Sequence, residues 1–130
     1  MKPTSTWIDE WRCGLDPSRE STISAELLKT FIEFWDQQKL DDKSKTTRNR
    51  YAGALHALGG YLVDRAVRED GLDKTADDLL FEHVTPLEGP LVHHDNEAWQ
   101  DELDMVCRKL YKHMEKRVTR DPSREGTNGF

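Results

Sequence analysis

Apolar residues recur at spacings of three and four along most of this chain, which is the pattern of amphipathic α-helices. The clearest stripe predicts a helix from about Ser44 to Glu69, stopped by Asp70-Gly71. Its inward positions are Tyr51, Leu55, Leu58, Leu62 and Ala66. Gly59 and Gly60 interrupt this helix. Because each glycine costs about 1 kcal/mol against alanine, the pair indicates a bend or the close approach of another helix.

Two further helices are predicted before this one. The first begins after Thr6, which forms a capping pair with Asp9, and ends at Gly14. Its apolar face holds Trp7, Ile8, Trp11 and Leu15, and it packs either on the bundle or on a second subunit. The turn-like residues DPSREST follow, after which Ser24 caps a second helix. The buried stripe of that helix is Leu27, Leu28, Phe31, Phe34 and Trp35.

The C-terminal third predicts a short helix, an extended connector and a long helix. Thr75 and Asp78 form a capping pair, and residues 85–94 contain two prolines. The last helix starts at Asp95 or Asn96, and its inward positions are Trp99, Leu103, Val106, Leu110 and Met114. No segment alternates at period two, so we predict an all-α fold, a small orthogonal bundle of four to five helices. Residues 1–120 form one domain, and residues 121–130 are expected to be a flexible tail.

Charge is strongly segregated along the chain, although the total of −6 is unremarkable. Residues 43–50 carry a net charge of +4 and residues 108–120 a net charge of +5, whereas residues 69–104 carry −11. An acidic protein is a poor non-specific ligand for nucleic acid, because binding requires Lys and Arg against the phosphates. Segregation nevertheless permits a basic face if the two positive segments meet in the fold.

Cysteine content and hydropathy indicate the compartment. Cys13 and Cys107 are too few and too far apart in sequence for a disulfide framework, and no apolar run is long enough to span a membrane. We therefore expect a cytoplasmic protein with reduced thiols and no membrane partner.

Two clusters of polar residues are candidates for chemical sites. His93, His94 and Asp95 could bind zinc with Cys107, His83 or His113, but their spacing matches no zinc motif, and a solvated loop explains them. The carboxylates Glu97, Asp101 and Asp104 share one helical side without a partner base or nucleophile, which favours a solvated face. We expect no metal, no cofactor and no enzymatic activity.

The predicted third helix carries a spaced motif. The pattern S-x-x-T-x-x-x-Y-x-x-x-L-x-x-(F/L)-x-x-(Y/W)-L is met by Ser44, Thr47, Tyr51, Leu55, Leu58, Tyr61 and Leu62. Over about residues 24–68 the chain resembles the N-terminal SAM-like, core-binding domain of tyrosine recombinases, with a related fold expected to about residue 115. The arginines, histidines and nucleophilic tyrosine of the recombinase catalytic domain have no counterpart here.

This resemblance implies a non-catalytic domain that contacts double-stranded DNA. The helix that starts at Ser44 would direct its N-terminal N–H groups at a phosphate. The residues expected to bind DNA are Lys43, Lys45, Thr46, Thr47, Arg48, Arg50, Arg108, Lys109, Lys112 and Lys116. The alternative is a helical protein–protein interaction module or homo-oligomer, in which acidic residues 69–104 and the Trp7/Trp11 helix form the working surface.

Overall fold

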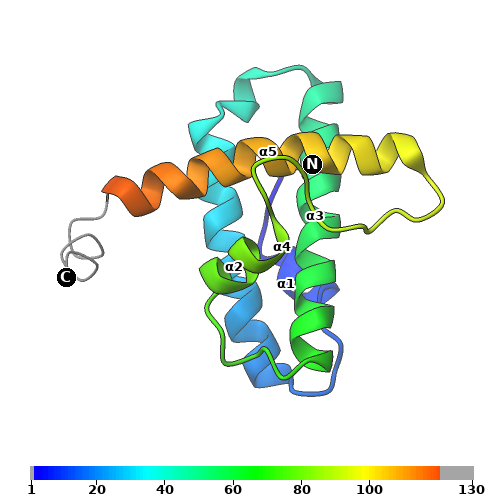
Figure 1. Ribbon diagram of the computed structural model, residues 1–130, viewed down its shortest axis with the longest axis vertical. Helices are drawn as coiled ribbons and strands as arrows, with labels where there is room; N and C mark the ends of the chain where they lie inside the picture. Colours follow the sequence, from blue (N-terminus) through cyan, green and yellow to red (C-terminus); the bar gives the residue numbers. More distant parts are fainter. Residues whose placement is uncertain (1, 121–130) are drawn as a thin grey trace.

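A computed structural model describes residues 2–120, and within that range it contains five α-helices, one short 3₁₀ helix and no strand (Figure 1). The elements are α1 Thr6–Glu10, α2 Pro17–Gln37, η1 Leu40–Asp42, α3 Lys45–Arg68, α4 Ala76–His83 and α5 Glu97–Arg120. The prediction of a small all-α bundle is confirmed. The predicted tail, residues 121–130, lies outside the described range, and the narrower likeness to a SAM-like domain stays a prediction.

Helices α2 and α3 lie side by side, and α5 crosses both of them (Figure 1). At its N-terminal end α5 continues past α3, and at its C-terminal end it continues past α2. Two contacts fix the crossing points: Lys109 of α5 meets Tyr51 of α3, and His113 of α5 meets Phe34 of α2. The ends of α5 therefore lie beyond the two helices that cover its middle.

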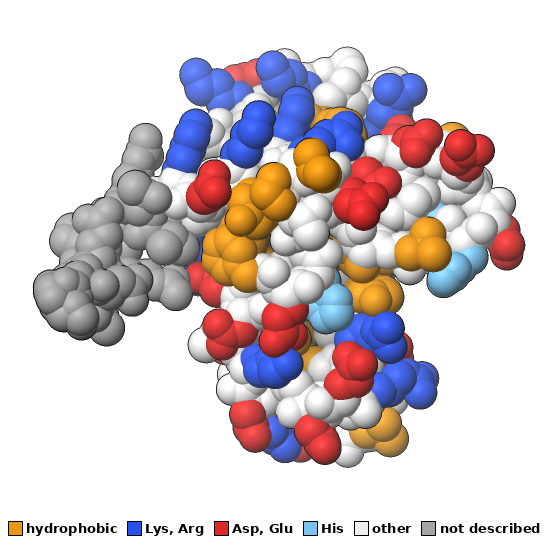
Figure 2. Space-filling model, in the orientation of Figure 1, with side chains coloured by type: hydrophobic (Ala, Val, Ile, Leu, Met, Phe, Trp, Pro, Cys, Tyr) orange, Lys and Arg blue, Asp and Glu red, His pale blue; other side chains and the backbone are white. Residues whose placement is uncertain are grey.

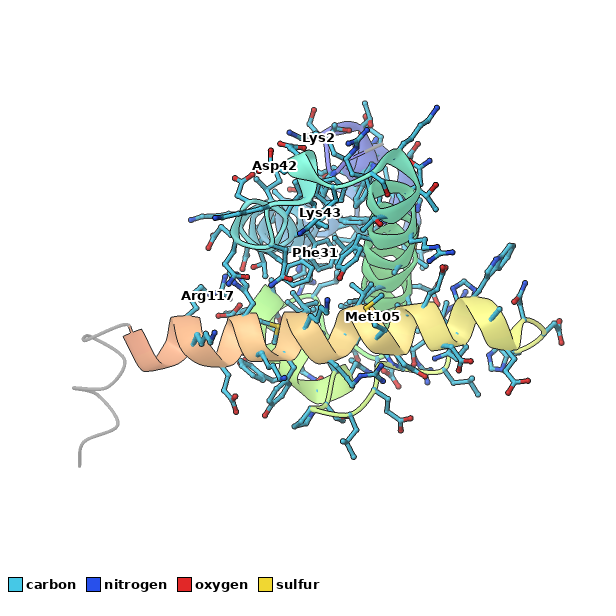
Figure 3. All side chains as sticks on the ribbon, turned by 90° about the horizontal axis from the view of Figure 1, so that it is seen from above. Lys2, Phe31, Asp42, Lys43, Met105 and Arg117 are labelled. Carbon is cyan, nitrogen blue, oxygen red and sulfur yellow. The ribbon has the colours of Figure 1, made fainter. Side chains whose placement is uncertain are left out.

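The core lies where these three long helices meet. Phe31, Leu55 and Leu110 have no exposed surface, and Phe31 points into the space between the helices (Figure 3). The predicted inward positions of α2 and α3 are all buried. Those of α5 are buried from Leu103 onward, but Trp99 is 59% exposed, so its predicted burial is wrong. It lies in the first turn of α5, on the end that continues past α3 (Figure 1).

Helix α1 packs on the bundle. Trp7 and Trp11 are only 2% and 4% exposed, and the indole N–H of Trp11 donates to the backbone oxygen of His56 at 2.9 Å. The indole lies on Gly59, where any side chain would collide with it. The glycine pair therefore marks a close approach between helices, which was one of its two predicted meanings.

The predicted boundaries near the N-terminus are wrong. Helix α1 ends at Glu10, its N-cap Ser5 makes no side-chain capping bond, and Thr6 lies within the helix instead of capping it. Leu15, expected on the apolar face, is 76% exposed. Helix α2 starts at Pro17, since Asp16 accepts a hydrogen bond from the Arg19 N–H and proline suits the first helical position.

Ser24 therefore lies inside α2, where it is buried. The later helix starts agree with the sequence. Ser44 caps α3, Thr75 and Asp78 form a capping box on α4, and Asn96 accepts from the Trp99 N–H at 3.0 Å at the start of α5. None of the described helices combines the length and the hydropathy needed to cross a bilayer.

Candidate nucleic-acid interface

The start of α3 is a capped helix end with basic side chains around it. The Ser44 Oγ accepts from the Thr47 N–H at 3.2 Å, so this N–H is already used within the protein. The N–H groups of Lys45 and Thr46 have no acceptor inside the helix, and the helix dipole adds positive potential there. The Arg48 guanidinium donates to the Lys43 backbone oxygen at 2.5 Å, which holds this arginine against the α2–α3 connector.

The basic half of α5 meets α3 near this end. The Lys109 ammonium donates to the Tyr51 hydroxyl at 2.8 Å and lies 5.6 Å from the centre of that ring. Lys109, Lys112 and Lys116 are spaced by three and four residues, so they share one side of α5. Tyr51 lies in the second turn of α3, so this contact brings the basic part of α5 close to the basic start of α3.

The two positive segments form one surface, which we call the basic face. Its members are Lys43, Lys45, Arg48, Lys109, Lys112 and Lys116. Figure 2 shows Lys and Arg side chains in a band along the C-terminal half of α5 and above it, over the connector and the start of α3. Seen from above, Lys43 lies between that connector and α5 (Figure 3).

Acidic groups border the basic face. Arg50 pairs with Glu102 of α5, with 3.1 Å between Nε and Oε1, which neutralises one predicted DNA contact. Asp41 pairs with Lys2 at 3.4 Å, and Asp42 lies close to Lys43 (Figure 3). The positive surface is thus bounded by acids, although α5 contributes three lysines to it from one side.

The remaining predicted residues lie elsewhere. Arg108 donates to the backbone oxygen of Leu87 at 3.1 Å, so it faces the connector between α4 and α5. Thr46 and Arg50 line a groove between α3 and the start of α5 with a volume of about 490 Å³. Of the ten predicted residues, the structure places six on the basic face, Thr47 in the helix cap, two in the groove and Arg108 on the connector.

Arg117 is a residue whose role the sequence did not reveal. Its guanidinium bonds the Thr30 hydroxyl at 3.2 Å and the Asp77 carboxylate, and it lies 3.6 Å from Glu33. These contacts tie the C-terminal half of α5 to α2 and α4 and so hold Lys112 and Lys116 in place. In the sequence Arg117 is one more cation in a basic run, and nothing there distinguishes it.

Asp104, one of the three aligned carboxylates, has a structural role. Asp104 accepts from the Gly89 N–H at 3.1 Å and from the Gln100 amide at 3.0 Å, so it holds the connector instead of facing solvent. Burial and the nearby Asp104 raise the pKa of the Cys107 thiol to about 12, so it stays protonated. No group of three or more His, Cys, Asp or Glu side chains within the described residues could hold a metal ion.

Comparison with known proteins adds no relative: no protein-family model, no curated protein and no solved structure matches the chain. The resemblance to recombinase core-binding domains therefore rests on the motif in residues 44–62 and on the aromatic helix before it. The geometry of the basic face is the observation on which a functional argument can be built.

Proposed function

We propose that this chain is a non-catalytic helical domain that binds double-stranded DNA through the basic face. The observation that carries this proposal is the contact between Lys109 and Tyr51, because it joins two positive segments that lie 58 residues apart in the sequence. The whole chain has a net charge of −6, so this surface concentrates positive charge on an otherwise acidic protein, and clustered Lys and Arg on one face are typical of nucleic-acid binding.

The supporting chemistry is that of phosphate contacts. Lysine and arginine side chains and helix N-termini are the groups that most often bind the DNA backbone, and they position a protein on the duplex without specifying sequence. The basic face offers five lysines, one arginine and the start of α3. Its predicted binding would therefore depend strongly on salt and weakly on sequence.

The test is fluorescence anisotropy of a labelled blunt duplex at about 50 and 200 mM salt. Four phosphate contacts would weaken binding about a hundredfold over that range. Lys112→Glu should weaken binding and flatten the salt dependence. Lys29→Glu makes the same charge change on α2, outside the basic face, and should leave both unchanged. Equal effects of the two variants, or no binding at tens of micromolar, would overturn the proposal.

A protein-interaction module is the second candidate, and one observation favours it. Phe81 and Leu87 are 38% and 75% exposed, and Phe81 meets Tyr111 edge-to-face with 5.7 Å between ring centres. Apolar side chains gather below α5 on the face that Figure 2 shows. The Trp7/Trp11 helix gives this reading no support, because both indoles are buried. A sedimentation coefficient that rises with protein concentration in the native protein, but stays at the monomer value in Phe81→Ser, would favour this candidate.

A further inference from the structure

The groove beside the basic face has the composition of a nucleobase site. It lies between one side of α3 and the first turns of α5, with a volume of about 490 Å³. Thr46, Asn49 and Arg50 line it with polar groups, and Trp99 forms an aromatic wall. Gly53 also lines the groove, and the space beyond its Cα is open. A flat aromatic group could therefore enter along α3 and stack on the indole.

Trp99 is exposed although its spacing predicted burial. All four tryptophans lie in the described part of the chain; Trp7, Trp11 and Trp35 are at most 4% exposed, whereas Trp99 is 59% exposed. An indole buries more apolar surface than most side chains, so leaving one in water forgoes a large stabilisation. Tryptophan is enriched at interfaces, because its ring is apolar and its N–H is polar, and an exposed indole beside a groove is suited to such a contact.

The aromatic wall is held in place by the connector before α5. The ring of His93 meets Trp99 edge-to-face at 5.6 Å between centres. The His93 N–H donates to the Gln100 Oε1 at 2.9 Å, and the Gln100 amide donates to the backbone oxygen of Pro90 at 2.9 Å. Gln100 thus fixes the connector to α5, so the wall exists before any ligand arrives and less ordering is needed on binding.

Charge identifies the occupant. The groove begins at Thr46, in the first turn of α3, next to Lys45 of the basic face. Its one lining carboxylate, Glu102, is paired with Arg50. A ligand in the groove would therefore have a polyanionic chain on the basic face and an aromatic group at Trp99. A nucleic-acid strand has this pairing of groups at every residue.

We propose that the groove receives an unpaired nucleobase, stacked on Trp99, from a DNA strand whose phosphates lie on the basic face. This inference rests on the proposed function and narrows its substrate to DNA that carries unpaired nucleotides beside a duplex. Bases inside a duplex are stacked on their neighbours and do not reach an indole at the protein surface. Stacking of this kind tolerates any base, because every base has a π-face.

The experiment compares a blunt duplex with the same duplex extended by an oligo-dT overhang of about eight nucleotides, within the span of one single-strand site. Anisotropy is measured for the native protein and for Trp99→Ala, Trp99→Phe and Leu91→Ala. Leu91 is 58% exposed, which matches Trp99, and it does not line the groove. Because Trp99 is the exposed tryptophan, quenching of intrinsic fluorescence by the overhang gives a second readout.

We expect the overhang to bind the native protein about 5- to 150-fold more tightly than the blunt duplex. Trp99→Ala should abolish this preference and the quenching without weakening the binding of the blunt duplex. Trp99→Phe should keep part of the preference for the overhang. Leu91→Ala should keep all of it. Circular dichroism melting should be unchanged in Trp99→Ala, since the side chain is exposed.

Three results separate failure of the groove from failure of the basic face. Salt-dependent binding without a preference for the overhang overturns the nucleobase site and leaves the basic face intact. Absence of binding to either DNA, at either salt, overturns both proposals. If the native protein sediments as an oligomer and Trp99→Ala sediments as a monomer, the groove binds a second copy of the chain. That result overturns the inference.

Discussion

The indole of Trp11 occupies the space beside Gly59 in which every other residue would have a Cβ. A Cβ built on Gly59 would lie within 2.5 Å of three indole atoms, Cζ2, Cε2 and Cη2. The indole is also anchored by its hydrogen bond to the His56 backbone oxygen, so it cannot swing away without losing that bond. At the end of α1 the indole thus packs directly on a glycine of α3, next to the contacts that Trp7 and Glu10 make with His56.

Gly59→Ala should destabilise the fold although alanine is the better helix former. The added methyl group must displace a buried ring, and overpacking of this kind costs about 1–3 kcal/mol. Urea unfolding followed by circular dichroism would measure the loss.

Gly53 in the same helix supplies the control. A Cβ there meets nothing within 4 Å, so Gly53→Ala should stabilise the protein by up to about 1 kcal/mol through helix propensity alone. If the free energy of unfolding of Gly59→Ala were as high as that of Gly53→Ala, the result would contradict close packing of the Trp11 indole on Gly59.

Glu20 holds the turn between α1 and α2. Its carboxylate accepts four backbone N–H groups, from Cys13, Gly14, Leu15 and Asp16, at 2.6 to 3.0 Å. Glu20→Gln replaces one acceptor oxygen by a donor that faces two of these N–H groups. Because hydrogen bonds to a charged group contribute more than neutral ones, we expect a loss of about 1–3 kcal/mol in the free energy of unfolding.

The same site predicts acid sensitivity. Burial would raise the pKa of Glu20, but the four backbone hydrogen bonds outweigh it and the pKa is lowered from its usual 4.5. A lowered carboxyl pKa stabilises the folded state above 4.5, and this contribution is lost as the pH falls through the folded value. Stability measured from neutral pH downward should fall less steeply in Glu20→Gln than in the native protein. The exposed control Glu88→Gln should follow the native curve.

The helix boundaries show what periodicity can and cannot predict. Ser44 and Ser24 both precede an apolar stripe, yet only Ser44 caps a helix, because Asp16-Pro17 starts α2 earlier and Glu20 stabilises the turn before it. The signal was present as an aspartate followed by proline, the preferred N-cap and first-turn residues. Choosing Asp16 over Ser24 as the cap depends on the contact of Glu20 with the preceding loop, and this tertiary contact is not visible in the sequence.

His113 predicts a loss of stability in a different pH range. Its pKa is lowered by burial first, then by Arg117 and Lys116, with Glu33 opposing them, and Phe34 packs against the ring. The unfolded chain therefore binds a proton at a higher pH than the folded one. Stability should fall as the pH drops below 6.5 and through the lowered value. His113→Phe should reduce this fall between about pH 7.5 and 5.5, as measured by urea unfolding. Parallel curves for the two proteins would contradict the prediction.

The candidate site was predictable in its charges but not in its shape. The sequence separated two basic segments from an acidic one, and the fold brought the two together. Trp99 could not be identified, because its spacing from Leu103 and Val106 is that of a core residue. Burial depends on where the two helices cross, and the N-terminal end of α5 continues beyond α3 (Figure 1). Only the crossing of two helices shows which residues of a stripe are left uncovered.

The ion pair of Arg50 and Glu102 predicts a variant with stronger DNA binding. Glu102→Gln removes the acid that borders the basic face and releases Arg50 to contact a phosphate. One additional contact should steepen the slope of log K against log salt by about 0.9 for a blunt duplex. Glu69→Gln breaks the comparable pair with Arg65, at 3.8 Å, at the far end of α3 and serves as the control. An unchanged slope in Glu102→Gln, together with a flatter slope in Lys112→Glu, would contradict this prediction. Arg50 would then not contact the phosphates, and the DNA-binding surface would not extend beyond Lys109 toward the groove.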